Sequence, residues 1–137
     1  MTIAASTTLL VARMFMASVF VFSASGKLRG DNRDIQAIVG LHLPYPSLLA
    51  RIVGGGEIIG ALMLTLGVAT QLAALLLGIF LFFVTLAFLP FWKIADDEAH
   101  FGAENAFFGN FGLMGGLAFI FVFGPGTYAL VPMAWPL

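Results

Sequence analysis

Three polar side chains interrupt the long apolar stretches of this chain: Arg13, Glu57 and Asn110. Glu57 lies about ten residues, or roughly 15 Å, from either end of its stretch, so its carboxylate cannot reach water along its own helix. A buried ionisable group of this kind is paired, protonated or exposed to a polar cavity. Glu57 is therefore a candidate for ligand binding or proton transfer, and the alternative is a structural carboxylate that locks helices together.

Arg13 is the strongest candidate partner for Glu57. It lies roughly 7 Å into the first apolar stretch, where it can extend to the interface, form a buried pair, or contact an anionic headgroup or substrate. No other strong cation from another helix is expected near the depth of Glu57. We therefore predict an Arg13–Glu57 pair, direct or through water, because side-chain reach can close a depth difference of about one helical turn.

The remaining polar candidates are Asn110, Gln71, Lys27 and His100. Asn110 either bridges two helices or contacts a ligand, and Gln71 is expected to cap its helix near the interface. Lys27 and His100 flank apolar stretches, so both are interpreted as interfacial residues. The histidines have no spacing typical of metal ligands, and no metal site is predicted.

The elements that must position these side chains are four long apolar segments. The chain has 137 residues, of which 61% are hydrophobic and 9% charged, and its mean hydropathy is +1.04. Soluble domains carry about 25% charged residues, whereas a membrane-spanning helix needs roughly 20 apolar ones. We predict an all-α integral membrane bundle in one domain, residues 1–137, with spans at about 8–27, 47–66, 69–90 and 104–123.

The connections between the spans suggest how the bundle is arranged. Residues 35–41 are compatible with a short interfacial helix, and a tight turn around Gly67 joins the second and third spans. The termini and this turn then share one face, and the two longer loops share the other. Most basic residues lie on the loop face, which favours cytoplasmic loops. The first span lacks a positive leading region and a clear cleavage site, so we expect it to be retained.

Glycines and aromatic residues indicate how the helices pack and what they could bind. Gly56 and Gly60, and Gly112 and Gly116, have the spacing of close helix packing. Most of the 15 phenylalanines lie in the third and fourth spans, where they could line a slot for a flat apolar ligand such as a quinone, or pack and face lipid. The chain has no cysteine, which excludes a dithiol centre, an iron–sulfur cluster and c-type haem attachment.

An ordered set of short motifs covers nearly the whole chain. It comprises LVARM at 10–14, SGKL at 25–28, GGEIIGA at 55–61, Asn110, and GPGTY at 124–128. In these features the chain resembles the DoxX family of small four-helix bacterial membrane proteins. The resemblance implies a location in the bacterial cytoplasmic (inner) membrane and marks Arg13, Lys27, Glu57 and Asn110 as the family's polar residues. Relatives often carry basic termini, which suggests the opposite orientation, so the orientation stays open.

Two functions fit these residues and this resemblance. Family members have been linked to a thiosulfate:quinone oxidoreductase, to quinone stress and to oxidative-stress complexes. The first function is a quinone-linked, redox-associated subunit in which Arg13, Glu57 and Asn110 line a pocket, with no covalently bound cofactor and with electrons supplied by a partner. The alternative is a non-catalytic accessory subunit of a larger membrane complex or homo-oligomer. The net charge of −1 gives no indication of a nucleic-acid partner.

Overall fold

The computed structural model describes residues 1–131, so residues 132–137 of the predicted domain lie outside the described part of the chain. Its elements, in order, are α1 (Ile3–Arg29), α2 (Asn32–Gly40), α3 (Pro46–Leu66), α4 (Thr70–Phe88), the short 3-10 helix η1 (Phe91–Lys93) and α5 (Asp97–Phe123). Four of the helices, α1, α3, α4 and α5, are long and apolar enough to cross a membrane. The prediction of an all-α bundle with four membrane spans is confirmed.

The first and last spanning helices begin earlier than hydropathy predicts, because polar caps start them. Thr2 accepts a hydrogen bond from the backbone N–H of Ala5 and begins α1. Asp96 accepts from the N–H of Ala99 at 2.9 Å and begins α5, whose acidic first turn suits the positive end of the helix dipole. Each of these helices has 27 residues, about 40 Å, and exceeds a hydrocarbon core of about 30 Å.

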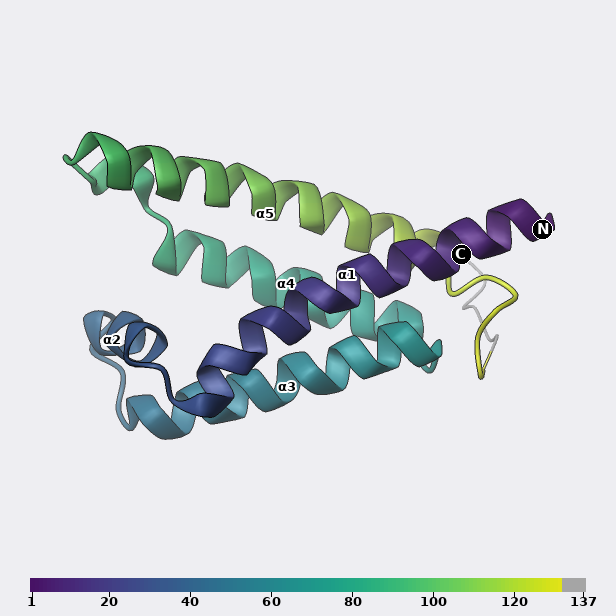
Figure 1. Cartoon of the computed structure of the whole chain (residues 1–137), viewed down its shortest axis with the longest axis horizontal. Coiled ribbons are helices and arrows are strands. Elements are labelled where there is room, and N and C mark those ends of the chain that lie inside the picture. Colours follow the sequence, from purple (N-terminus) through teal and green to yellow (C-terminus); the bar gives the residue numbers. More distant parts are fainter. Residues whose placement is uncertain (132–137) are drawn as a thin grey trace.

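The bundle consists of two helix pairs. α1 packs along α3, and α4 packs along α5, while the α3–α4 contact joins the two pairs (Figure 1). The core combines small and large apolar side chains, which lets the helices approach closely. It comprises Ala17, Phe20, Ala61, Leu64, Ala73, Ala74, Leu77, Leu81, Leu117 and Ile120.

Only part of the predicted glycine packing occurs within the chain. A Cβ on Gly60 would meet the Leu77 side chain at 2.9 Å, and one on Gly116 would meet Met16 at 2.5 Å, so both glycines lie at helix contacts. Gly56 and Gly112 are exposed and have no such neighbour within 4 Å. Neither glycine contacts another helix within the described residues, so the predicted packing at these two positions does not occur there.

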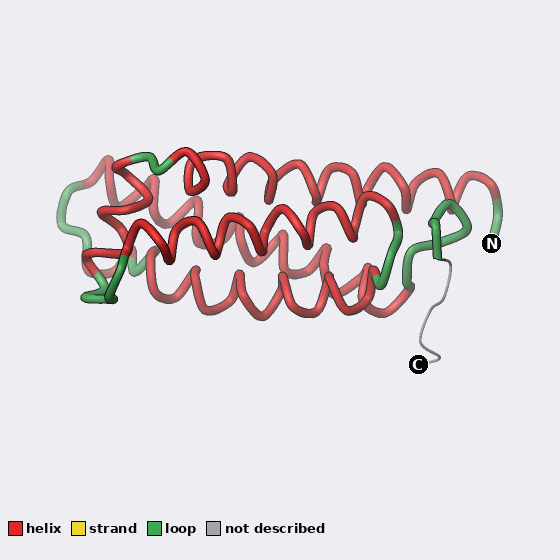
Figure 2. The backbone as a smooth tube through the Cα atoms, turned by 90° about the horizontal axis from the view of Figure 1, so that it is seen from below, coloured by secondary structure: helices red, strands yellow, loops and turns green. Residues whose placement is uncertain are grey.

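The segments that the sequence predicted to share each end of the bundle do lie together. The N-terminus, the α3–α4 turn and residues 124–131 lie at one end, and α2 and η1 lie at the other (Figures 1 and 2). Residues 124–131 fold back on the turn, where the N–H of Leu130 donates to the carbonyl of Leu66 at 2.9 Å. Ser6 Oγ also donates to Thr127 Oγ1 at 3.0 Å. The short helix expected at residues 35–41 corresponds to α2, which packs against α3.

Candidate functional site

Glu57 forms a buried network with two side chains of α1. The Nζ of Lys27 lies 3.1 Å from Oε2 and 3.3 Å from Oε1 of Glu57. Ser23 Oγ donates to Oε1 of Glu57 at 3.2 Å and accepts from Lys27 Nζ at 2.6 Å. Only 4% of Glu57 is exposed, whereas 17% of the Lys27 side chain is exposed, so the carboxylate is the buried member of a partly buried pair. Ser23 and Lys27 lie four residues apart and therefore occupy one face of α1.

A glycine on α3 makes this contact between the helices possible. A Cβ on Gly54 would lie 3.1 Å from the Cβ of Lys27 and 3.2 Å from the backbone carbonyl of Ala24. Any side chain at this position would push α1 away from α3. Because Gly54 lies one turn before Glu57, the close approach brings the Lys27 ammonium to the carboxylate one turn deeper in the bundle.

The predicted Arg13–Glu57 pair is wrong. Arg13 donates from Nη1 to the backbone carbonyl of Leu64 at 3.2 Å and from Nη2 to that of Tyr128. Leu64 lies about two turns along α3 from Glu57, roughly 10 Å, so the register of α1 against α3 keeps the two charges apart. Lys27, predicted to be an interfacial anchor, instead points inward and forms the salt bridge.

Arg13 joins three parts of the chain at the turn end of the bundle. It is completely buried, and its guanidinium donates to backbone carbonyls of residues 64 and 128. The C-terminal carbonyls of α3 suit a cation, since they lack helical partners and lie at the negative end of the helix dipole. Arg13 therefore holds residues 124–131 against α1 and α3, away from the Glu57 network.

Two amides connect α4 to α5. Asn110 Nδ2 donates to Thr85 Oγ1 at 2.9 Å, and Thr85 in turn donates to the carbonyl of Leu81 at 2.6 Å. Gln71 is buried, and its Nε2 donates to the carbonyl of Phe121 at 2.7 Å. Gln71, predicted to cap its helix near the interface, lies in the first turn of α4 and contacts α5 through this hydrogen bond. The expected pocket of Arg13, Glu57 and Asn110 does not form, because each side chain contacts a different part of the bundle.

His100 lies in the first turn of α5 rather than in a loop. Its Nδ1 is 3.2 Å from the carbonyl of Ile94, and its Nε2 is 3.7 Å from a carboxylate oxygen of Glu104. Its ring meets that of Phe91 edge to face, with the ring centres 5.5 Å apart. His100 thus connects η1 to α5 at the loop end of the bundle and does not reach the Glu57 network.

Two cavities adjoin at the Lys27–Glu57 pair. The first, of about 420 Å³, lies between α2, α3 and α4, and the second, of about 300 Å³, follows α3 and α4. Val53 and Phe80 line both, whereas Lys27 lines the first and Glu57 the second. We call the first the head cavity and the second the α3–α4 groove. Sites for small molecules have volumes of about 300–1,000 Å³ and combine apolar walls with a few polar groups.

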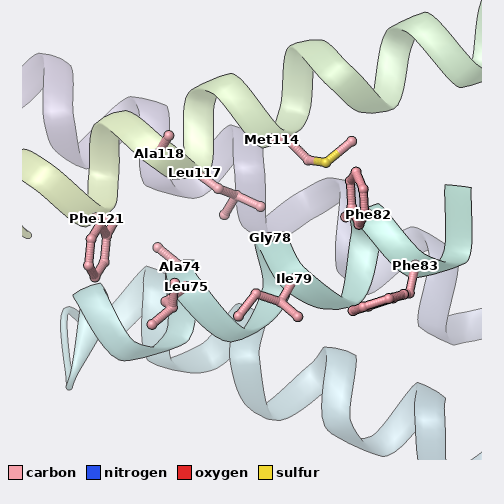
Figure 3. A pocket seen from close by; sticks show the side chains of 10 residues that line it. All are labelled: Ala74, Leu75, Gly78, Ile79, Phe82, Phe83, Met114, Leu117, Ala118 and Phe121. Atoms are coloured by element: carbon pink, nitrogen blue, oxygen red, sulfur yellow. The ribbon is translucent and has the colours of Figure 1, made fainter.

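A third cavity has no such polar group. It has a volume of about 350 Å³ and lies between α4 and α5 (Figure 3). Met114 and Phe121 of α5 point toward α4 on either side of Leu117, above the α4 side chains (Figure 3). Its ten lining residues are all apolar, so it offers room for hydrocarbon and nothing that could orient a ring. The phenylalanines of this cavity, Phe82, Phe83 and Phe121, are therefore separate from the charged network.

The fold and the site define a small four-helix membrane bundle with a buried ion pair between two of its helices. The DoxX family model matches residues 8–90, and the chain belongs to this family. The matched region holds Arg13, Lys27 and Glu57 and ends before Asn110.

The chain is similar to the inner membrane protein YphA of Escherichia coli (strain K12). The two are 25% identical over 122 residues, which cover 89% of this chain and 86% of YphA. No solved structure matches the chain significantly. The family, this relative and the four spanning helices establish a multi-pass protein of the bacterial inner membrane.

Proposed function

We propose that this protein is a quinone-linked, redox-associated subunit of the inner membrane, in which the quinone head group binds beside Lys27 and Glu57. The observation that carries the proposal is the position of this ion pair between two adjoining cavities, each of the size of a small-molecule site. The pair offers a hydrogen-bond donor and an acceptor at one point. Arg33 and Asp34 add two further charged side chains to the head cavity, and its other lining residues are apolar. A quinone oxygen accepts from such a donor, and a quinol hydroxyl donates to such an acceptor.

Lys27 and Glu57 would have different roles in the reduction of a quinone. A quinone becomes a quinol by taking up two electrons and two protons. Lys27 can donate to the ring oxygen, and Glu57 can exchange the proton, as a carboxylate does in general acid–base catalysis. Ser23 also donates to Glu57, so the carboxylate stays oriented when Lys27 turns to a ligand. The electrons come from a partner protein, because the chain has no cysteine and its own side chains carry none.

Apolar side chains of the head cavity would hold the ring. Phe80, Val84 and Phe88 form its α4 wall, and Ile38 and Leu41 lie on the side of α2. A planar ring packs well against such side chains. This wall replaces the expected phenylalanine slot on α4 and α5, which lacks a polar partner for the ring oxygens.

Direct binding tests this proposal. The protein would be purified into lipid nanodiscs, and its affinity for a tailless benzoquinone would be measured for the wild type, Lys27→Met and Glu57→Gln. A hydrogen bond to a charged group contributes about 1.5–3 kcal/mol, so we expect each variant to bind roughly tenfold more weakly or worse.

Glu104→Gln is the matched control, because it makes the same chemical change at a half-exposed carboxylate remote from both cavities. It should bind the quinone as the wild type does. Wild-type affinity in Glu57→Gln, with helix content retained by circular dichroism, would contradict the proposal. So would wild-type protein that shows no saturable binding.

The second candidate function is that of an accessory subunit, and the outer surface of α5 favours it. Among the described residues of this helix, only Leu117 and Ile120 are buried. Gly102, Gly109 and Gly112 have open space where a Cβ would lie, and such glycines let another helix approach closely. A partner subunit or a second copy would then cover α5. This function predicts that the untagged protein co-purifies in a complex of defined stoichiometry, and that Glu57→Gln changes assembly rather than quinone binding.

A further inference from the structure

We propose that the α3–α4 groove binds the isoprenoid tail of the same molecule whose head occupies the head cavity. The inference rests on the proposed function and adds the substrate class: a quinone with a single polyprenyl chain. Lining residues of the groove include Ile59, Met63, Leu76 and Leu77, and Glu57 is its one ionisable member. The groove therefore has a polar end and a long apolar continuation.

The dimensions and the connection of the groove fit a chain that follows a ring. It shares Val53 and Phe80 with the head cavity, so the two cavities adjoin at these residues. From Val53 to Met63 it follows ten residues of α3, roughly 15 Å, which is the length of a few isoprene units. Ile59 and Leu76 are exposed, so the groove opens sideways toward the lipid tails.

Continuity with the proposed head site selects this occupant over a phospholipid. The groove adjoins the head cavity at Val53 and Phe80, and apart from Glu57 its lining residues are apolar. Arg33 and Asp34 line the head cavity and not the groove, so a diacyl lipid whose head group contacts them is the alternative that the experiment tests.

Gly56 forms part of the groove wall and gives a direct way to close it. It is exposed, lines the groove and has no neighbour within 4 Å of a Cβ position. A leucine at this position would fill the space without displacing another helix. Gly55 is the matched control, because it also has no neighbour within 4 Å but lines neither the groove nor the head cavity.

The experiment compares two probes in nanodiscs: a tailless benzoquinone and the same ring with a short polyprenyl tail. We expect Gly56→Leu to weaken binding of the tailed quinone at least tenfold and to leave the tailless one unchanged. Gly55→Leu should change neither affinity. Ile59→Trp, which narrows the groove from a second position, should reproduce the effect of Gly56→Leu if the first variant folds poorly.

Three results would overturn the inference. The first is unchanged affinity for the tailed quinone in Gly56→Leu and Ile59→Trp. The second is an equal loss of affinity for the tailed and the tailless quinone in Gly56→Leu. The third is a diacyl lipid that co-purifies with the wild type and not with Gly56→Leu, while the affinity for the tailed quinone is the same in both. Failure of the head site is distinguishable, because Glu57→Gln would then leave binding of the tailless probe unchanged.

Discussion

The most direct structural prediction concerns the removal of Lys27. In Lys27→Met the ammonium is replaced by an apolar group, and Glu57 loses two contacts, at 3.1 and 3.3 Å. Among the described residues, the hydrogen bond from Ser23 Oγ at 3.2 Å then remains to the carboxylate. Breaking a buried pair by removing one partner costs about 3–5 kcal/mol in soluble proteins, because it leaves a buried charge uncompensated. We expect a loss of roughly 3 kcal/mol, since one of the three hydrogen bonds to the carboxylate remains.

The assay is unfolding in mild detergent, followed by circular dichroism, for the wild type, Lys27→Met, Glu57→Leu and the double variant. Replacing both members of a buried pair by apolar residues is often neutral or stabilising. The double variant should therefore be more stable than Lys27→Met, and the double-mutant cycle should give a coupling energy of at least about 1 kcal/mol. Additive losses in the double variant would refute the assignment of Lys27 as the partner of Glu57.

Three further predictions concern the rest of the bundle. Gly67→Ala should destabilise the protein by about 2 kcal/mol or more in the same unfolding assay. Gly67 has a φ of 72°, and a Cβ there would lie 2.7 Å from the Cα of Ala129. Wild-type stability of this variant would contradict the described turn. Arg13→Lys should make residues 124–131 more sensitive to limited proteolysis, because the compact ammonium lacks the planar fork of donors with which the guanidinium bridges the carbonyls of Leu64 and Tyr128. An unchanged digestion pattern would contradict this role. Asn110→Leu should lose about 0.6–1.7 kcal/mol, the range for hydrogen bonds between membrane helices, and should lose nothing further in a Thr85→Val background if the bond at 2.9 Å is the relevant contact.

The fold is predictable from hydropathy because each spanning helix must satisfy its backbone internally and present apolar side chains to lipid. The helix starts are less predictable, because a polar first turn has low hydropathy and is therefore assigned to a loop. In α5 the acidic residues that follow Asp96 are helical. The helix therefore begins at Asp97, whereas hydropathy predicted a start at Glu104. A capping Asp followed by acidic residues is the signal that indicates the true start.

The site was predicted only in part, because depth along a helix does not determine the register between helices. Glu57 is the carboxylate of the network, as its position suggested, but counting residues from the apolar boundaries selected Arg13 as its partner. The close approach at Gly54 sets the register and places Lys27 beside Glu57. The sequence does contain one usable signal: Ser23 and Lys27 lie on one face of α1, and a polar pair at this spacing favours a buried partner over an interfacial anchor.

Photolabelling with a reactive quinone would show whether the head cavity beside Lys27 and Glu57 binds the ring. A benzoquinone with a short polyprenyl tail and a photoreactive group on the ring would be activated in nanodiscs, and the labelled peptides would be identified by mass spectrometry. We expect labelling of the head-cavity walls near Val53, Phe80 and Phe88, which excess unlabelled quinone suppresses and Lys27→Met strongly reduces. Labelling confined to the lipid-facing surface of α5, or insensitive to unlabelled quinone, would contradict it.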